Sequence, residues 1–223
     1  IILDEMNIAR VEYYFAEMLS ILEMPSRDEW VVDIIPNSWP SDPKHIVNGQ
    51  LKIPPNMWYI GTANNDDSTF AITDKVYDRA MPINIDTKGV AFDAPLTDSV
   101  YISYKHFEDI LNAAKAQNVV SEENIKKIAL LDDYVIEHFR IAFGNRIVKQ
   151  LRDFVPAYVG TGGTELDGLD YVLARKVFRK FESLNLSYIR DEIDGLCAYI
   201  DELFGEENMT ESKDYLRILK KLV

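Results

Sequence analysis

The chain opens with the stretch Ile1-Ile2-Leu3-Asp4-Glu5-Met6-Asn7, in which an apolar run leads directly into two adjacent carboxylates. Short apolar runs of this kind are typical of parallel strands that are buried on both faces. In α/β proteins, ligands bind at the carboxyl ends of such strands. The stretch therefore predicts a buried strand that brings Asp4 and Glu5 to a ligand-binding edge. The alternative is a solvated strand end without chemistry.

A second apolar run ends in the same way, in the stretch Met57-Trp58-Tyr59-Ile60-Gly61-Thr62-Ala63-Asn64. If the two strands are neighbours, the amide of Asn64 lies beside the acids of the first strand. An Asp at such an edge can hold Mg²⁺ directly or through water, and a neighbouring Glu can polarise the water that attacks a γ-phosphate. The two strand ends together favour a metal–phosphate site.

These two stretches resemble motifs of the AAA+ ATPases, specifically of the branch that contains the McrB-type GTPases of modification-dependent DNA restriction. The pair Asp4-Glu5 resembles their Walker B motif, and Gly61-Thr62-Ala63-Asn64 resembles their sensor-1 strand. The run Asn64-Asn65-Asp66-Asp67 resembles their Met-Asn-x-x-Asp signature, with Ala63 in place of Met. The resemblance implies Glu5 and Asn64 as catalytic residues, Asp4 as the Mg²⁺ ligand and Asp67 as a nucleotide-binding residue.

The resemblance also gives Arg79 a function. In the family, the helix before the last core strand ends in arginines, and here Arg79 ends the helix expected over residues 68–80, before a strand expected over 81–85. The resemblance implies an arginine finger that reaches into the site of a neighbouring subunit. The alternative is an ion pair with Asp78 or Asp74.

A second arginine, Arg146, lies within Phe143-Gly144-Asn145-Arg146-Ile147-Val148, which resembles the start of the lid helix that carries the sensor-2 arginine. The stretch from Leu169 to Phe178 likewise resembles the family's Leu-Asp-x-x-Ile-x-x-Lys-Val-Leu segment. The resemblance implies that Arg146 contacts the γ-phosphate. The alternative is a solvated Arg in the first turn of a helix.

The predicted fold class is α/β followed by all-α. Residues 1–88 are expected to form the C-terminal part of an AAA+ αβα core, with a helix from Ile8 to Leu22 and an inserted β-hairpin over 30–35 and 50–53. Residues 89–223 are expected to form a helical lid. The predicted lid helices begin after Ser103 and Ser121, near Asn145, after Gly163, and at Ser187 and Thr210.

The composition of the chain limits the kinds of partner and environment that are expected for it. The net charge is −13 and both halves of the chain are acidic, so any DNA is expected to be gripped by other segments or subunits. The single cysteine, Cys197, allows no internal disulfide and favours a cytoplasmic protein. No apolar run reaches the length that spans a membrane.

The sequence contains no Gly-x-x-x-x-Gly-Lys-Ser/Thr loop, so the resemblance implies a Walker A loop upstream of Ile1 in a longer parent protein. The expected function is hydrolysis of ATP or GTP with Mg²⁺ in a hexameric ring that works with a nuclease subunit in DNA restriction or defence. The alternative is a degenerate AAA+ scaffold without nucleotide turnover. Departures from the family at Ala63, Ser68 and Tyr77-Asp78 keep that alternative open.

Overall fold

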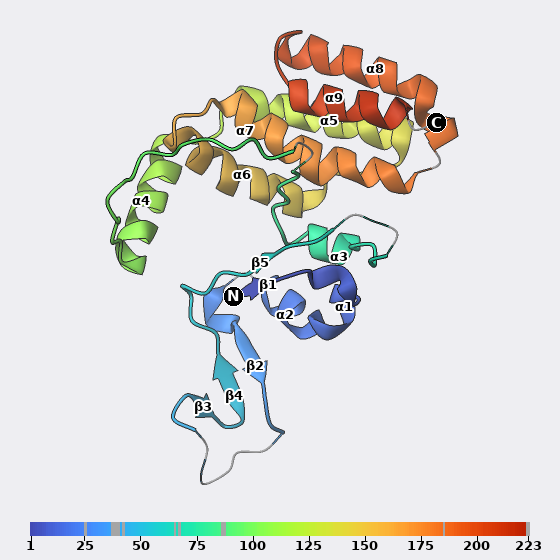
Figure 1. Cartoon of the computed structure of the whole chain (residues 1–223). Coiled ribbons are helices and arrows are strands. Elements are labelled where there is room, and N and C mark those ends of the chain that lie inside the picture. Colours follow the sequence, from blue (N-terminus) through green and yellow to red (C-terminus); the bar gives the residue numbers. More distant parts are fainter. Residues whose placement is uncertain are drawn as a thin grey trace. The chain divides into compact units, whose positions relative to one another are not determined.

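The computed structural model divides the chain into two compact units, Ile1–Asp86 and Thr87–Val223. The first unit combines short strands and helices, and the second is helical, so the chain is an α/β unit followed by an all-α unit (Figure 1). The residues that the structure describes are 1–24, 26–36, 41, 43–64, 66, 68–85, 88–184 and 186–221, without the side chains of 186–188.

The two strands with polar ends are parallel neighbours, as predicted. Strand β1 (Ile2–Leu3) pairs with β5 (Ile60–Gly61) in the register Ile2 to Ile60 and Leu3 to Gly61. The expected burial of β1 is wrong, because Ile2 is 71% exposed and Ile60 is 57% exposed. The reason is that, among the described residues, this sheet has two strands and its apolar side chains lack a covering layer.

The predicted hairpin is present as part of a three-stranded antiparallel sheet. Strand β4 (Gln50–Lys52) lies between β2 (Val31–Asp33) and β3 (Ile46–Val47). The turn between β3 and β4 is Asn48-Gly49, and both residues have positive φ angles, of 54° and 79°. Asn-Gly is the dipeptide that accepts two positive φ angles at least cost, so it fixes the register of this tight hairpin.

The helix expected from Ile8 to Leu22 is interrupted. A 3₁₀ turn at Met6–Ile8 is followed by α1 (Val11–Tyr14) and α2 (Ala16–Ile21). The break falls at Phe15, where φ is −109° and ψ is 13° and where the ring packs edge-on against Tyr59 with centroids 5.5 Å apart. Three adjacent aromatic residues with modest helix propensity precede and include the break, so tertiary packing overrides the helical pattern here.

Two expectations for the end of the first unit are wrong. The helix expected over 68–80 is confined to α3 (Asp74–Tyr77), because Asp66 and Ser68 form a local side-chain turn that competes with helix. Residues 81–85 form no strand. Pro82 lacks the N–H group that a ladder needs, and Ile83 is 78% exposed.

In the second unit, residues 88–103 form neither helix nor strand, and long helices follow them. A π-helical turn, Leu173–Val177, and a 3₁₀ stretch, Phe178–Ser183, continue the chain after α7. The helices are α4 (Tyr104–Gln117), α5 (Glu122–Phe139), α6 (Gly144–Gly160), α7 (Glu165–Val172), α8 (Leu186–Phe204) and α9 (Thr210–Lys221). In the part of the chain that the structure describes, none of the helices has the length and apolar character of a membrane span.

Local sequence determines where these helices begin. The predicted N-caps are confirmed: Ser103 accepts from His106 N at 3.1 Å, and Ser121 accepts from Asn124 N at 3.3 Å. Thr164 caps α7 in the same way, at 3.1 Å from Asp167 N. Each cap gives an otherwise unpaired N–H of the first turn an acceptor, which stabilises a helix by typically about 1 kcal/mol.

Large apolar side chains are buried in the second unit, and Asp170 on α7 binds the start of the last helix. The largest fully buried side chains are Phe178, Phe181, Leu131, Leu151, Leu169, Leu173, Ile193, Leu196, Ile200 and Leu216. Asp170 on α7 is 4% exposed, and its carboxylate accepts from Glu211 N and Ser212 N, both at 2.8 Å. Burial raises the pKa of the Asp170 carboxyl, and these hydrogen bonds act in the opposite direction.

Asp170 therefore serves as an N-terminal cap for α9 from another helix, and its removal should destabilise the second unit. Asp170→Ala leaves two N–H groups without an acceptor, which costs about 1–3 kcal/mol. Asp170→Asn, which keeps an acceptor, should cost less. Denaturant unfolding followed by far-UV circular dichroism measures both.

The control is Asp133→Ala, an exposed carboxylate on α5 whose loss should change stability by at most about 0.5 kcal/mol. Equal stability of Asp170→Ala and Asp133→Ala would show that the α9 cap contributes nothing.

Candidate functional site

The carboxyl ends of β1 and β5 are joined by the side chain of Thr62. Its hydroxyl donates to Asp4 Oδ1 at 2.7 Å and accepts from Glu5 N, also at 2.7 Å. The backbone of Thr62 completes the ladder, since its N–H donates to Leu3 O at 3.0 Å and its carbonyl accepts from Met6 N at 2.8 Å. Thr62, which directly follows β5, thus contacts both of the acids that directly follow β1.

Glu5 has an unusual backbone conformation. Its φ of 49° and ψ of 46° place it in the left-handed region, which a non-glycine residue rarely adopts. Such conformations cost free energy, persist where the surroundings hold them in place, and cluster at functional sites. Here the turn directs the chain from β1 into the 3₁₀ turn while the carboxylate of Glu5 stays exposed.

Asn7 ties the loop that follows β5 to the end of β1. Its side-chain Nδ2 donates to Asn64 O at 2.7 Å and to Phe70 O at 3.1 Å, and its backbone carbonyl accepts from Phe70 N at 2.9 Å. Asn7 is 4% exposed, and its Oδ1 is buried without a hydrogen-bond partner in the described part of the chain. This one side chain holds both ends of the loop from Asn64 to Phe70.

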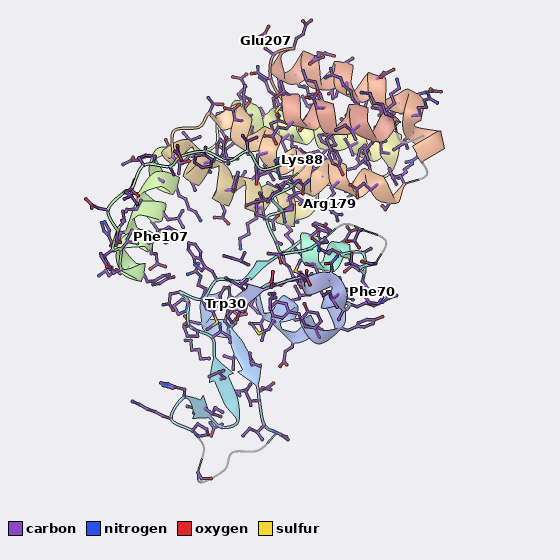
Figure 2. All side chains as sticks on the ribbon, viewed as in Figure 1. Trp30, Phe70, Lys88, Phe107, Arg179 and Glu207 are labelled. Carbon is purple, nitrogen blue, oxygen red and sulfur yellow. The ribbon has the colours of Figure 1, made fainter. Side chains whose placement is uncertain are left out.

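The same loop is braced from within. Thr69 Oγ1 donates to Asn64 O at 2.9 Å, and Asp66 Oδ1 accepts from Ser68 N at 2.9 Å. The hydrogen bonds from Ser68 lower the pKa of the Asp66 carboxyl. Phe70 lies at the far end of the loop (Figure 2). The guanidinium carbon of Arg10 is 5.3 Å from the centre of its ring. The carbonyl of Asn64, with two donors, is therefore well fixed, while the residue itself is exposed.

Gly61 lets the two strand ends approach closely. A Cβ atom at this position would lie 2.3 Å from the Sδ of Met6, well inside van der Waals contact. Met6 in turn packs against the apolar cluster of Val11, Leu19 and Val76. A side chain at this position would therefore require Met6, the residue that follows the two acids, to move.

The structure brings three of the predicted site residues to one edge of the first unit. Asp4 and Glu5 follow β1, Asn64 follows β5, and all three are exposed. Asp67 lies outside the described residues. Arg146 belongs to the second unit, where it is exposed in the first turn of α6.

Arg79 is held within its own unit. Its guanidinium forms an ion pair with Glu23, its Nε donates to Leu19 O at 2.7 Å, and its Nη1 donates to Lys75 O. The side chain of Arg79 is 15% exposed. The alternative to a finger was an ion pair with Asp78 or Asp74, whereas the ion pair that the structure shows is with Glu23, on the chain that leaves α2.

The donor set at the edge suits a hard cation. Carboxylate and amide oxygens are the protein ligands that Mg²⁺ accepts, and Mg²⁺ usually takes one or two carboxylates together with waters and phosphates. Among the described residues, no group of three His, Cys, Asp or Glu side chains forms a metal cage.

The sequence alone did not identify Thr62 and Asn7 as residues that shape the candidate site. Both lay inside quoted stretches, but their importance depends on the strand register, which the pattern did not determine. A polar residue directly after a glycine at a strand end, opposite an acid, was the signal that could have identified Thr62.

Comparisons with protein-family models, curated proteins and solved structures find no significant match to this chain.

Asn7 should control the order of the loop after β5. Asn7→Ala leaves the carbonyls of Asn64 and Phe70 without this donor, which costs about 1–3 kcal/mol of local stability. Hydrogen exchange measured by mass spectrometry should then be faster in peptides that cover residues 60–70.

Asn56→Ala, which changes an exposed asparagine in a turn, is the matched control and should leave the exchange of these peptides unchanged. If the two variants exchange alike, Asn7 does not anchor the loop.

Proposed function

We propose that this chain is part of an AAA+ nucleoside triphosphatase that hydrolyses ATP or GTP with Mg²⁺ in a ring. The chain would supply the sheet edge with the catalytic residues and the helical lid. The observation that carries the proposal is the convergence of Asp4, Glu5 and Asn64 at the carboxyl ends of two parallel neighbouring strands. This is the edge at which α/β folds bind ligands. The parent would work with a nuclease subunit in DNA restriction or defence.

The exposure of the strand pair also supports the proposal. Parallel strands are normally covered on both faces, whereas Ile2 and Ile60 are each more than half exposed. An AAA+ core would place further strands and helices against these side chains. The parent would also supply the phosphate-binding loop, of which this sequence has no copy.

Each residue of the edge would have a distinct role. Mg²⁺, when bound with the nucleotide, would neutralise charge on the phosphate oxygens. Asp4 would hold the cation through the carboxylate that Thr62 orients. Glu5 would accept a proton from the attacking water, and Asn64 would orient that water. Arg146 would contact the γ-phosphate from the lid.

A scaffold without turnover is the second candidate function, and the environment of Arg79 favours it. A finger must reach a neighbouring subunit, and here the guanidinium pairs with Glu23 and donates to two carbonyls of its own chain. For Arg79 to act as a finger, it would have to leave Glu23 when the ring assembles.

The first test of the proposed function is Glu5→Gln in the parent protein. The amide cannot accept the proton, so hydrolysis should fall about 10²–10⁴-fold while nucleotide affinity is retained. Phosphate release and equilibrium nucleotide binding measure the two quantities.

Glu17→Gln, an exposed position on α2, is the matched control, and residues 1–223 alone should not turn over nucleotide. Wild-type turnover by Glu5→Gln would contradict the assignment of Glu5 as the base.

The second test asks whether Arg79 is an arginine finger or a residue that stabilises only its own subunit. If Arg79 acts in the adjacent site, Arg79→Ala should reduce turnover by about 10³–10⁵-fold with little change in nucleotide affinity. Rings mixed from Arg79→Ala and Glu5→Gln subunits should regain activity, because some interfaces then pair an intact Glu5 with an intact Arg79.

Glu23→Gln is the matched variant, since it weakens the ion pair and keeps the guanidinium. Under the finger model it turns over normally. Inactive mixed rings, together with a Glu23→Gln variant as impaired as Arg79→Ala, would show that Arg79 is structural.

A further inference from the structure

We propose that Thr62 is a positioning residue that sets the geometry of both acids, Asp4 through its carboxylate and Glu5 through its backbone. The inference rests on the proposed function, and it adds a residue to which the family resemblance gave no role. The hydroxyl of Thr62 is the group in the described chain that contacts both acids directly.

The hydrogen-bonding capacity of a hydroxyl matches this double role. A hydroxyl has one donor and two acceptor lone pairs. Thr62 uses its donor on Asp4 Oδ1 and one lone pair on Glu5 N, each at 2.7 Å. Asp4 Oδ1 is thus oriented by a protein donor, as carboxylates that bind metals commonly are, and such supporting partners contribute about 10–100-fold to metal affinity or activity.

The contact with Glu5 has a separate consequence. Glu5 is in the left-handed region, with a φ of 49°, and the N–H that Thr62 accepts belongs to this strained residue. Without that acceptor, the extended conformation becomes more favourable for Glu5. Because the Cα–Cβ direction depends on φ and ψ, such a relaxation would turn the carboxylate of Glu5 away from its present direction.

Three features show that this contact is a property of the strand pair. The N–H of Thr62 donates to Leu3 O and its carbonyl accepts from Met6 N, so the backbone on both sides of Asp4-Glu5 is fixed to Thr62. The register Leu3 to Gly61 places Thr62 directly after the last paired residue. A one-residue slip would move the hydroxyl to the other face of the pair.

The experiment compares Thr62→Val, which has the same shape but no hydroxyl, with Thr62→Ser, which keeps the hydroxyl. In residues 1–223, the amide hydrogen of Glu5 should exchange about 2- to 10-fold faster in Thr62→Val, the range expected for the loss of one hydrogen bond. Thr62→Ser should exchange like the wild type. NMR of the backbone amides provides this readout without nucleotide or activity.

Thr69→Val is the matched control for exchange, because its hydroxyl donates to Asn64 O and Asp66 O and contacts neither acid. Thr62→Ala gives a second hydroxyl deletion, so the comparison does not depend on one substitution. Unchanged Glu5 exchange in both hydroxyl deletions would overturn the proposal.

In the parent protein, Thr62→Val should raise the Mg²⁺ concentration that half-saturates nucleotide binding about 10- to 100-fold and lower kcat, while metal-free nucleotide affinity stays constant. Thr62→Ser should restore both. Equal Mg²⁺ dependence of Thr62→Val and wild type would overturn the positioning role. Failure of the proposed function would look different, because the wild-type parent would then show no nucleotide turnover, or Glu5→Gln would leave its turnover intact, whatever the exchange at Glu5.

Discussion

The parallel ladder between β1 and β5 is the constraint on which the first unit depends. It joins residues that are 57 positions apart in the chain, as in the contact of Glu5 with Thr62. The register of the ladder determines which polar side chains lie next to each other beyond its end. The hydroxyl of Thr62 lies between the acids only because Leu3 is opposite Gly61. Gly61 allows this approach because a side chain there would overlap Met6. The ladder is short, and at its carboxyl end the hydroxyl of Thr62 adds to the backbone hydrogen bonds.

The residues beside the acids combine unfavourable features with hydrogen bonds that compensate for them. Glu5 in the left-handed region and the unpaired Oδ1 of Asn7 are both unfavourable, and each lies beside compensating hydrogen bonds, from Glu5 N to Thr62 and from Asn7 Nδ2 to two carbonyls. The combination is typical of sites in which geometry matters more than stability. It also explains why the acids can remain exposed while their backbone is fixed. Rigidity here comes from the residues next to the acids and not from burial of the acids.

The sequence allowed parts of this fold to be predicted, for identifiable reasons. Strand ends, helix caps such as Ser103 and Ser121, and the all-α second unit depend on local patterns, and these predictions agree with the structure. The burial of Ile2, the continuous helix through Phe15 and the strand over 81–85 depend on tertiary partners, and these were wrong. Asp4, Glu5 and Asn64 were proposed from the sequence because they are conspicuous polar residues at the ends of apolar runs. Thr62 and Asn7 were missed because their roles exist only in the folded register.

Asp170 shows why a resemblance in sequence does not by itself assign chemistry. It lies in a stretch that resembles a family segment, yet both of its carboxylate oxygens accept N–H groups at the start of α9. Lys176, from the same stretch, is 4% exposed. Asp170 is therefore used in holding α9 to α7, and its physical role is stability. Asp4 differs in that one oxygen is oriented by Thr62 while the residue stays exposed at a strand end. Exposure combined with a fixed orientation, rather than motif similarity, is what separates a carboxylate available to a ligand from one that is used by the fold.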